Sequence, residues 1–141
     1  LQSRGLGDVY KRQVPPAAAV QNTDRAAKYR NTPTERVTAS GAVLRFDSQK
    51  EARRYDHLTI RQKAGEIHDL RLQVDFTLQE AYTDPEGRRV RAIRYRADFT
   101  YRERDGRLVV EDVKSKPTRT REYLIKRKLM KERRGIDITE V

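Results

Sequence analysis

Two charged residues near the end of the chain have the types and the spacing of a catalytic pair. Asp112 and Lys114 are separated by one residue in a valine-rich segment that predicts a β-strand. Successive side chains of a strand point to opposite faces, so Asp112 and Lys114 project together while Val113 points away. A further acid, Asp98, lies on the strand predicted before this one.

The turn between these two strands predicts how the acids pair. Asp105-Gly106 is typical of a tight β-hairpin, which makes the two strands antiparallel neighbours. A two-residue turn there sets position 98 opposite position 113, so that Asp98 is a diagonal neighbour of Asp112 and Lys114. A bulge, or a shift of one residue, would set Asp98 directly beside Asp112, and in either register the groups can interact.

Two carboxylates side by side in a partly buried site repel each other and call for a cation. Oxygen ligands of this kind favour Mg²⁺ or Mn²⁺, and Mg²⁺ keeps several waters while a few carboxylates hold it. Such a metal lowers the pKa of a bound water and polarises a phosphate, while Lys114 can position the water or counter developing charge. The pattern therefore predicts phosphodiester hydrolysis.

Sequence periodicity predicts the elements that must position these residues. We expect a hairpin over 37–46, a helix over 48–64, strands over 67–78, 90–102 and 108–114, a helix over 118–134, and a last short strand. This order, helix–three strands–helix–strand, predicts an α/β fold with a mixed β-sheet flanked by helices.

Local signals support these boundaries. Ser48 to Glu51 has the capping-box pattern of a helix start, and Gly65 and Gly135 are helix stops. Adjacent valines at 109 and 110 predict a strand that is buried on both faces. One face of the middle strand is expected to carry Ile93, Tyr95, Ala97, Phe99 and Tyr101.

Several stretches of the chain together resemble a known family. The matching strings are Lys28-Tyr29-Arg30-Asn31, Phe46-Asp47-Ser48, Glu51-Ala52-Arg53-Arg54-Tyr55, Ala97-Asp98-Phe99 and Glu111-Asp112-Val113-Lys114. They are similar to a phage-associated family of unknown function within the PD-(D/E)XK nuclease superfamily, over about residues 28–141. The resemblance implies a restriction-endonuclease-like core, Mg²⁺-dependent cleavage and a phage or prophage origin.

The resemblance also implies residue roles. Glu51, Asp98 and Asp112 would be metal ligands and Lys114 the catalytic lysine. The sequence departs from the signature at Ala97, where the superfamily's name has proline, and this relaxation is common.

Each of these residues also has a structural interpretation. Glu51 can serve only the capping box, Asp98 and Asp112 can pair with surface arginines, and Lys114 can be one more basic surface residue. Glu111 points to the other face and is expected to form an ion pair. Gln73 could reach the face of the candidate site, although a strand glutamine is more often structural or solvated. Neither His57 nor His68 has the partners of a catalytic histidine.

Composition bounds the class of protein. The chain has 141 residues, no cysteine, a formal net charge of +11 and a pI near 10.2. This length suits one domain, and the absence of cysteine excludes disulfides and thiolate–zinc sites. A basic charge of this size predicts a polyanionic partner, nucleic acid first. No apolar stretch approaches the roughly 20 residues that cross a bilayer, so we expect no membrane partner and a cytoplasmic protein of the bacterial host.

The beginning of the chain is expected to stand apart from the fold. The segment Asp8 to Gln13 back-translates to a sequence that resembles a transposase end used in sequencing libraries, so residues 1–13 are interpreted as an adapter artefact. Residues 14–35 are interpreted as a flexible basic arm, and residues 36–141 as a single nuclease-like domain.

The expected DNA contacts lie on the arm and around the second helix. They are Lys28, Arg30, Lys116, Arg119, Arg121, Lys126 and Lys128, although a solvated basic helix face is the simpler interpretation.

The leading hypothesis is therefore a Mg²⁺-dependent DNA endonuclease, with branched or recombination DNA as a candidate substrate. A homodimer would suit paired cuts. The alternative is a non-catalytic basic nucleic-acid-binding protein, which shares the charge and differs only in its acids. An anionic-membrane binder is a poor third, because the basic helix has a narrow apolar face.

Overall fold

The computed structural model describes residues 34–141. The predicted segment 1–13, most of the predicted arm, Lys28 and Arg30 therefore lie outside the described residues. The chain divides between Gln49 and Lys50 into two compact units. Each unit is described by itself.

Of the first unit, the described part is a β-hairpin. Strand β1, Thr34–Val37, pairs antiparallel with β2, Val43–Phe46, as the sequence predicts. The expectation that the arm extends to residue 35 is wrong at its last two residues, because Thr34 and Glu35 continue the backbone ladder opposite Phe46 and Arg45.

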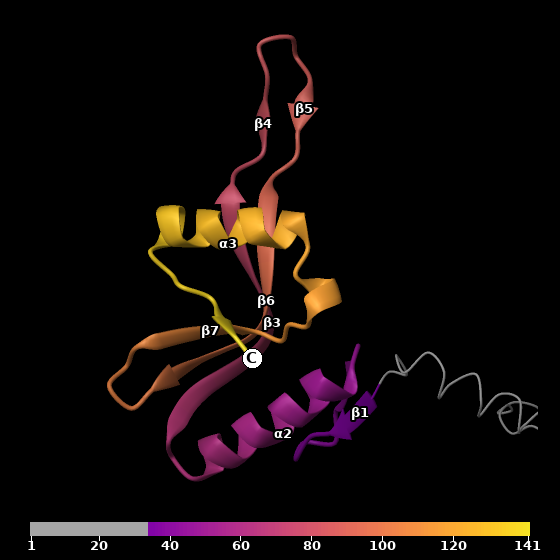
Figure 1. Cartoon of the computed structure of the whole chain (residues 1–141), viewed down its shortest axis with the longest axis vertical. Helices are drawn as coiled ribbons and strands as arrows, with labels where there is room; N and C mark the ends of the chain where they lie inside the picture. The colour runs from indigo at the N-terminus through magenta and orange to yellow at the C-terminus, as the bar shows by residue number, and fades with distance from the viewer. Residues whose placement is uncertain (1–33) are drawn as a thin grey trace, which may run out of the picture. The chain divides into compact units, whose positions relative to one another are not determined.

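The second unit has the predicted order of main elements. Along the chain these are α2 (Gln49–Lys63), β3 (Ile67–Gln79), β4 (Tyr82–Thr83), β5 (Arg89–Val90), β6 (Ile93–Glu103), β7 (Leu108–Asp112), a 3₁₀ turn (Lys116–Thr118), α3 (Arg121–Arg134) and β8 (Thr139–Glu140). The sheet order is β3–β6–β7–β8, with β8 parallel to β7 and the other pairs antiparallel. The prediction of an α/β fold with a mixed sheet and helices is confirmed (Figure 1).

The β6–β7 turn differs from the expected two-residue form and corrects the register. The amide of Glu103 donates to the carbonyl of Arg107, and Gly106 has φ 88°, so Arg104 to Gly106 form a three-residue loop that ends in a left-handed residue. Glycine takes this conformation without a Cβ penalty. The strands then pair Phe99 with Glu111, and the same register sets position 98 opposite position 112.

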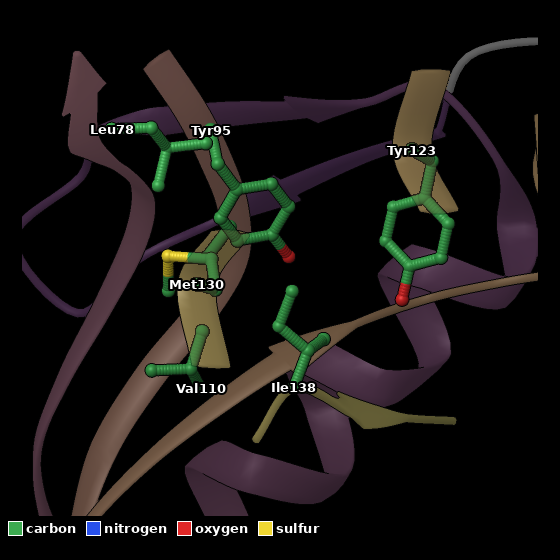
Figure 2. Close-up of a cluster of buried hydrophobic side chains, with 7 residues drawn as sticks. Leu78, Tyr95, Val110, Tyr123, Met130 and Ile138 are labelled. Atoms are coloured by element: carbon green, nitrogen blue, oxygen red, sulfur yellow. The ribbon is translucent and has the colours of Figure 1, made fainter. Parts of the chain in front are cut away.

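Helix α3 covers one face of the sheet through an apolar cluster. Thr120 caps the helix by accepting a hydrogen bond from the amide of Tyr123, so the helix begins three residues later than predicted. Gly135 ends it with φ 66°. Figure 2 shows the cluster, to which β3, β6, β7, α3 and the segment before β8 contribute Leu78, Tyr95, Ala97, Val110, Tyr123, Met130 and Ile138.

Helix α2 is held on the opposite face by a buried ion pair. Arg54 donates from Nε to Glu111 Oε1 at 2.8 Å and from Nη2 to Oε2 at 2.5 Å, and Tyr101 donates its hydroxyl to the same carboxylate. Glu111 is fully buried, and its neighbour Val110 lies in the α3 cluster, so β7 is covered on both faces as predicted. The expectation that Glu111 forms an ion pair is confirmed.

The side-chain alternation of β6 changes in its middle, contrary to the expected single stripe. Tyr95 and Ala97 belong to the α3 cluster, whereas Phe99 is opposite Glu111, which faces α2. The change of face falls at Asp98.

Beyond the sheet, β4 and β5 form a separate two-stranded hairpin that projects past α3 (Figure 1). The strand predicted over 90–102 is therefore interrupted at Arg91 and Ala92. The turn of the β4–β5 hairpin is closed by Asp84, which accepts hydrogen bonds from the amide and the guanidinium of Arg88.

The Arg54–Glu111 pair leads to a prediction about stability. Arg54→Met leaves a buried carboxylate without its cation, which should cost about 3 kcal/mol or more of unfolding free energy. Urea unfolding followed by circular dichroism measures this loss. Arg96→Met is the matched control, because Arg96 pairs with Asp75 at the surface and its loss should change the stability far less. Equal losses in the two variants would contradict the role given to Arg54.

Candidate active site

The structure brings together the acids that the sequence singled out on the strands. Asp98 on β6 and Asp112 at the end of β7 lie opposite each other in the strand register, near enough for Asp112 to raise the pKa of Asp98. Asp98 also accepts a hydrogen bond from the amide of Val113 at 2.8 Å, which fixes its carboxyl beside the end of β7. The direct pairing follows from the three-residue turn, which removes the one-residue offset of the shorter turn.

Asp112 lies among hydrogen-bond donors. The hydroxyl of Tyr95 donates to its Oδ2 at 2.6 Å, and Lys114 Nζ is 3.0 Å from its Oδ1. Burial is the main cause that raises the pKa of Tyr95 far above its ordinary value, with the bond to Asp112 adding to it, so the hydroxyl stays a donor. Asp112 is 4% exposed, and its orientation is therefore fixed from two sides.

Lys114 is held in place at both its ends. Its ammonium lies 4.2 Å from the centre of the Tyr123 ring, a cation–π contact that adds to the pairing with Asp112. Its amide donates to the carbonyl of Val141, and Lys50 Nζ donates to its carbonyl at 2.6 Å. The amine is thus directed toward Asp112 by contacts with α2, α3 and the segment after β8.

Glu51 reaches the same place from the first turn of α2. It is 7% exposed, and its Oε2 accepts a hydrogen bond from Gln73 Nε2 at 3.1 Å. The same nitrogen lies 3.4 Å from Asp98 Oδ1, so Gln73 bridges the helix acid and the strand acid. Gln73 therefore reaches the face of the site, which the sequence left open beside a structural or solvated role.

The protonation of Asp98 reflects the crowding of these acids. Burial first, and then the hydrogen bond to Asp112 and the charge of Glu51, raise the pKa of Asp98 to about 8, against the lowering effect of the Val113 amide. Asp98 consequently keeps its proton at neutral pH, where an ordinary aspartate is ionised.

A proton on Asp98 relieves the repulsion between neighbouring acids, as a bound cation also would. No three His, Asp or Glu side chains within residues 34–141 form a ready-made metal group. The buried carboxyl group of Asp112 and the half-buried one of Asp98 nevertheless supply the hard oxygen donors that suit Mg²⁺, which needs few protein ligands because it keeps its waters. The donor set of Asp98 and Asp112, with Glu51 behind Gln73, therefore fits such an ion.

The basic residues expected to contact DNA fall into two groups. Arg119 pairs with Glu140 at 3.0 Å and Lys126 with Glu122 at 3.0 Å, so both are engaged within the protein. Lys116, Arg121 and Lys128 are exposed and form no ion pair with the described residues.

Tyr95 and Lys50 are site residues that the sequence argument did not select. Tyr95 was assigned to an apolar stripe, although a tyrosine at a buried position needs a partner for its hydroxyl, and Asp112 is that partner. Lys50 precedes Glu51 and gave no signal of its own.

Comparison with known proteins gives the class and then the family. The fold and site define an α/β protein with a carboxylate–lysine site on adjacent strands. The chain belongs to the family described as Protein of unknown function (DUF1064), whose model matches residues 26–139. No curated protein and no solved structure matches the chain. None of the helices within residues 34–141 is long and apolar enough to cross a membrane.

The raised pKa of Asp98 predicts a pH dependence of stability. In the unfolded chain this group ionises near pH 4, whereas in the folded protein it holds its proton up to about pH 8. Folding is therefore disfavoured progressively as pH rises from about 4 to about 8, because the folded state binds the extra proton. Asp98→Asn should remove this term and raise the melting temperature by several degrees at pH 8, with little effect at pH 4.

Thermal unfolding with a chelator present checks this expectation. Asp75→Asn is the control, because Arg96 lowers the pKa of Asp75 and its replacement should lower stability above about pH 4. A lower melting temperature for Asp98→Asn than for the wild type at pH 8 would contradict the assignment.

Proposed function

We propose that the protein is a Mg²⁺-dependent DNA endonuclease, with Mn²⁺ as a substitute ion. The observation that carries the proposal is the placement of Asp98 opposite Asp112 on paired strands, with Lys114 Nζ 3.0 Å from Asp112. Adjoining carboxyl groups with one ammonium beside them suit the hydrolysis of a phosphodiester. The likeness to PD-(D/E)XK nucleases supports the same reading and adds phage origin and action in the bacterial cytoplasm to the proposal.

Each residue has a role that its contacts support. Asp98 and Asp112 would hold the ion, with Glu51 as a further ligand, and the ion would supply a water of lowered pKa and polarise the phosphate. Tyr95 and the Val113 amide keep the two carboxyl groups oriented. Lys114 directs its ammonium at the attacking water or at the charge that develops on the phosphate.

Exposed lysines and arginines supply the affinity for a polyanion. Lys116, Arg121 and Lys128 form no ion pair with the described residues, and their guanidinium and ammonium groups can therefore neutralise phosphates. Branched or recombination DNA is the proposed substrate class, and two copies of the chain would supply the two active sites that paired cuts need.

Loss of Asp112 or of Lys114 should strongly lower the rate of DNA cleavage and leave DNA binding unchanged. Asp112→Asn and Lys114→Met should each lower the rate of plasmid and junction cleavage by about 100-fold or more, because each removes a group at the reacting centre. Gel assays with Mg²⁺, with Mn²⁺ and with a chelator measure this. Lys131→Met is the control, since Lys131 pairs with Asp137 at the surface and should leave the rate unchanged.

The alternative function predicts another result in the same assay. A non-catalytic nucleic-acid-binding protein binds DNA with or without a chelator and cleaves none of it, and Asp112→Asn changes nothing. That outcome would refute the nuclease proposal and leave the basic surface as the explanation of the charge.

The assignment of DNA contacts predicts how binding depends on salt. The double variant Arg121→Gln/Lys128→Gln should flatten the slope of log K against log salt by about 0.9 for each charge that contacts a phosphate. Fluorescence anisotropy with a labelled duplex over a range of salt measures the slope. Arg119→Gln is the comparison, because Arg119 pairs with Glu140, and a larger change there than in the double variant would reverse the assignment.

A further inference from the structure

The side-chain amide of Gln73 occupies the space between two acids. Its Nε2 lies 3.1 Å from Glu51 Oε2 and 3.4 Å from Asp98 Oδ1. An amide nitrogen carries two hydrogens and accepts none, so it can donate to both acids at once. In the absence of a cation, the amide is the group that holds these two acids toward a common point.

The backbone of Gln73 is unusual for a strand residue. Its φ is 53°, in the left-handed region that residues with a Cβ rarely adopt. The pairs on either side, Leu72 with Phe99 and Val74 with Ala97, keep one register, so no inserted residue explains this conformation. Such a backbone persists where the surrounding structure over-determines it, often at functional sites.

Asp69 on the same strand shows the ordinary case for comparison. Its φ is 61°, but it lies where the register shifts between His68 and Arg71, as in a β-bulge. Aspartate also adopts the left-handed region more readily than glutamine does. The register shift explains the backbone conformation of Asp69, whereas the conformation of Gln73 needs another explanation.

The contacts of Gln73 supply that explanation. Glu51 is on α2 and Asp98 is on β6, opposite position 73 in the register, and the amide reaches both. The change of face along β6 also falls at Asp98, so the strand pair is irregular on both strands at this one point.

We propose that Gln73 is a component of the ion site. In the metal-free protein its amide nitrogen spaces and aims Glu51 and Asp98. The carbonyl oxygen of the same amide would be the atom that binds the ion, a donor type that hard cations accept. This inference rests on the proposed function for its second part, since the ion belongs to that proposal.

Calorimetric titration of the full chain with Mn²⁺ tests the ligand role. Gln73→Met keeps the length of the side chain and removes both amide atoms, so the affinity for Mn²⁺ should fall about 10-fold or more. Gln79→Met is the matched control on the same strand and should bind as the wild type does. Gln73→Glu restores an oxygen at the same distance, and its affinity should equal or exceed that of the wild type.

The outcomes separate this inference from the proposed function. Wild-type affinity in Gln73→Met, together with loss of binding in Asp112→Asn, would overturn the role of Gln73 and leave the nuclease proposal standing. An affinity of Gln73→Glu as weak as that of Gln73→Met would overturn the ligand role in the same way. Failure of the wild type to bind Mn²⁺ would instead overturn the ion site itself, and the ligand role of Gln73 with it.

A second measurement needs no cleavage and tests the metal-free arrangement. The Gln73 side-chain NH₂ resonances, assigned by their absence from Gln73→Met, should move in Glu51→Gln and in Asp98→Asn with a chelator present. Asp75→Asn, on the same strand, should leave them in place. Addition of Mg²⁺ should move them again, because the nitrogen loses its acceptors. NH₂ resonances that do not shift in either variant would contradict the hydrogen bonds of Gln73 to Glu51 and Asp98.

Discussion

Two neighbouring carboxyl groups in a partly buried site cannot both be charged unless a hydrogen-bond donor or a cation compensates them. This constraint organises the second unit. Asp98 and Asp112 are kept close together by a β-strand register that brings them opposite each other. The groups around them each supply a compensating hydrogen or positive charge: Tyr95, Lys114, Gln73 and the Val113 amide. Helices α2 and α3 are then the elements that carry or support these groups. The α3 cluster fixes Tyr95, and the buried pair of Arg54 and Glu111 fixes the helix that carries Glu51.

The two adjacent acids of β7, Glu111 and Asp112, point to opposite faces of the sheet and have different partners. Glu111 points to α2, where a bidentate arginine compensates its charge within the fold. Asp112 points to α3, where a tyrosine, a lysine and a second acid surround it. The charge of Glu111 is already balanced by arginine, so this acid has no need of a metal ion. An acid that lies beside another acid can instead lose a proton and bind a metal ion. The strand thus places a structural acid and a candidate functional acid on consecutive residues.

The sequence predicted the elements and most of the strand chemistry, because hydrophobic period and turn residues are local signals. Alternation put Asp112 and Lys114 on one face, and the hairpin brought Asp98 beside them. The register was off by one residue, because Asp105-Gly106 suits a two-residue turn and a three-residue loop equally well, and only the pairing decides. The hydrogen bond of Tyr95 to Asp112 and the bridging position of Gln73 between two acids could not be predicted, for another reason. Their roles depend on a left-handed backbone and on a buried hydroxyl, which tertiary contacts impose and local patterns do not reveal.

The two ends of β6 differ in how much change in length they can absorb. At one end, the loop of Arg104 to Gly106 sets which residues of β6 and β7 face each other, so an insertion there would carry Asp98 away from Asp112. At the other end, the β4–β5 hairpin projects beyond the sheet, and added or lost residues there leave that pairing untouched. Within the family, the projecting hairpin is therefore where we expect chain lengths to diverge, while the short loop keeps its length.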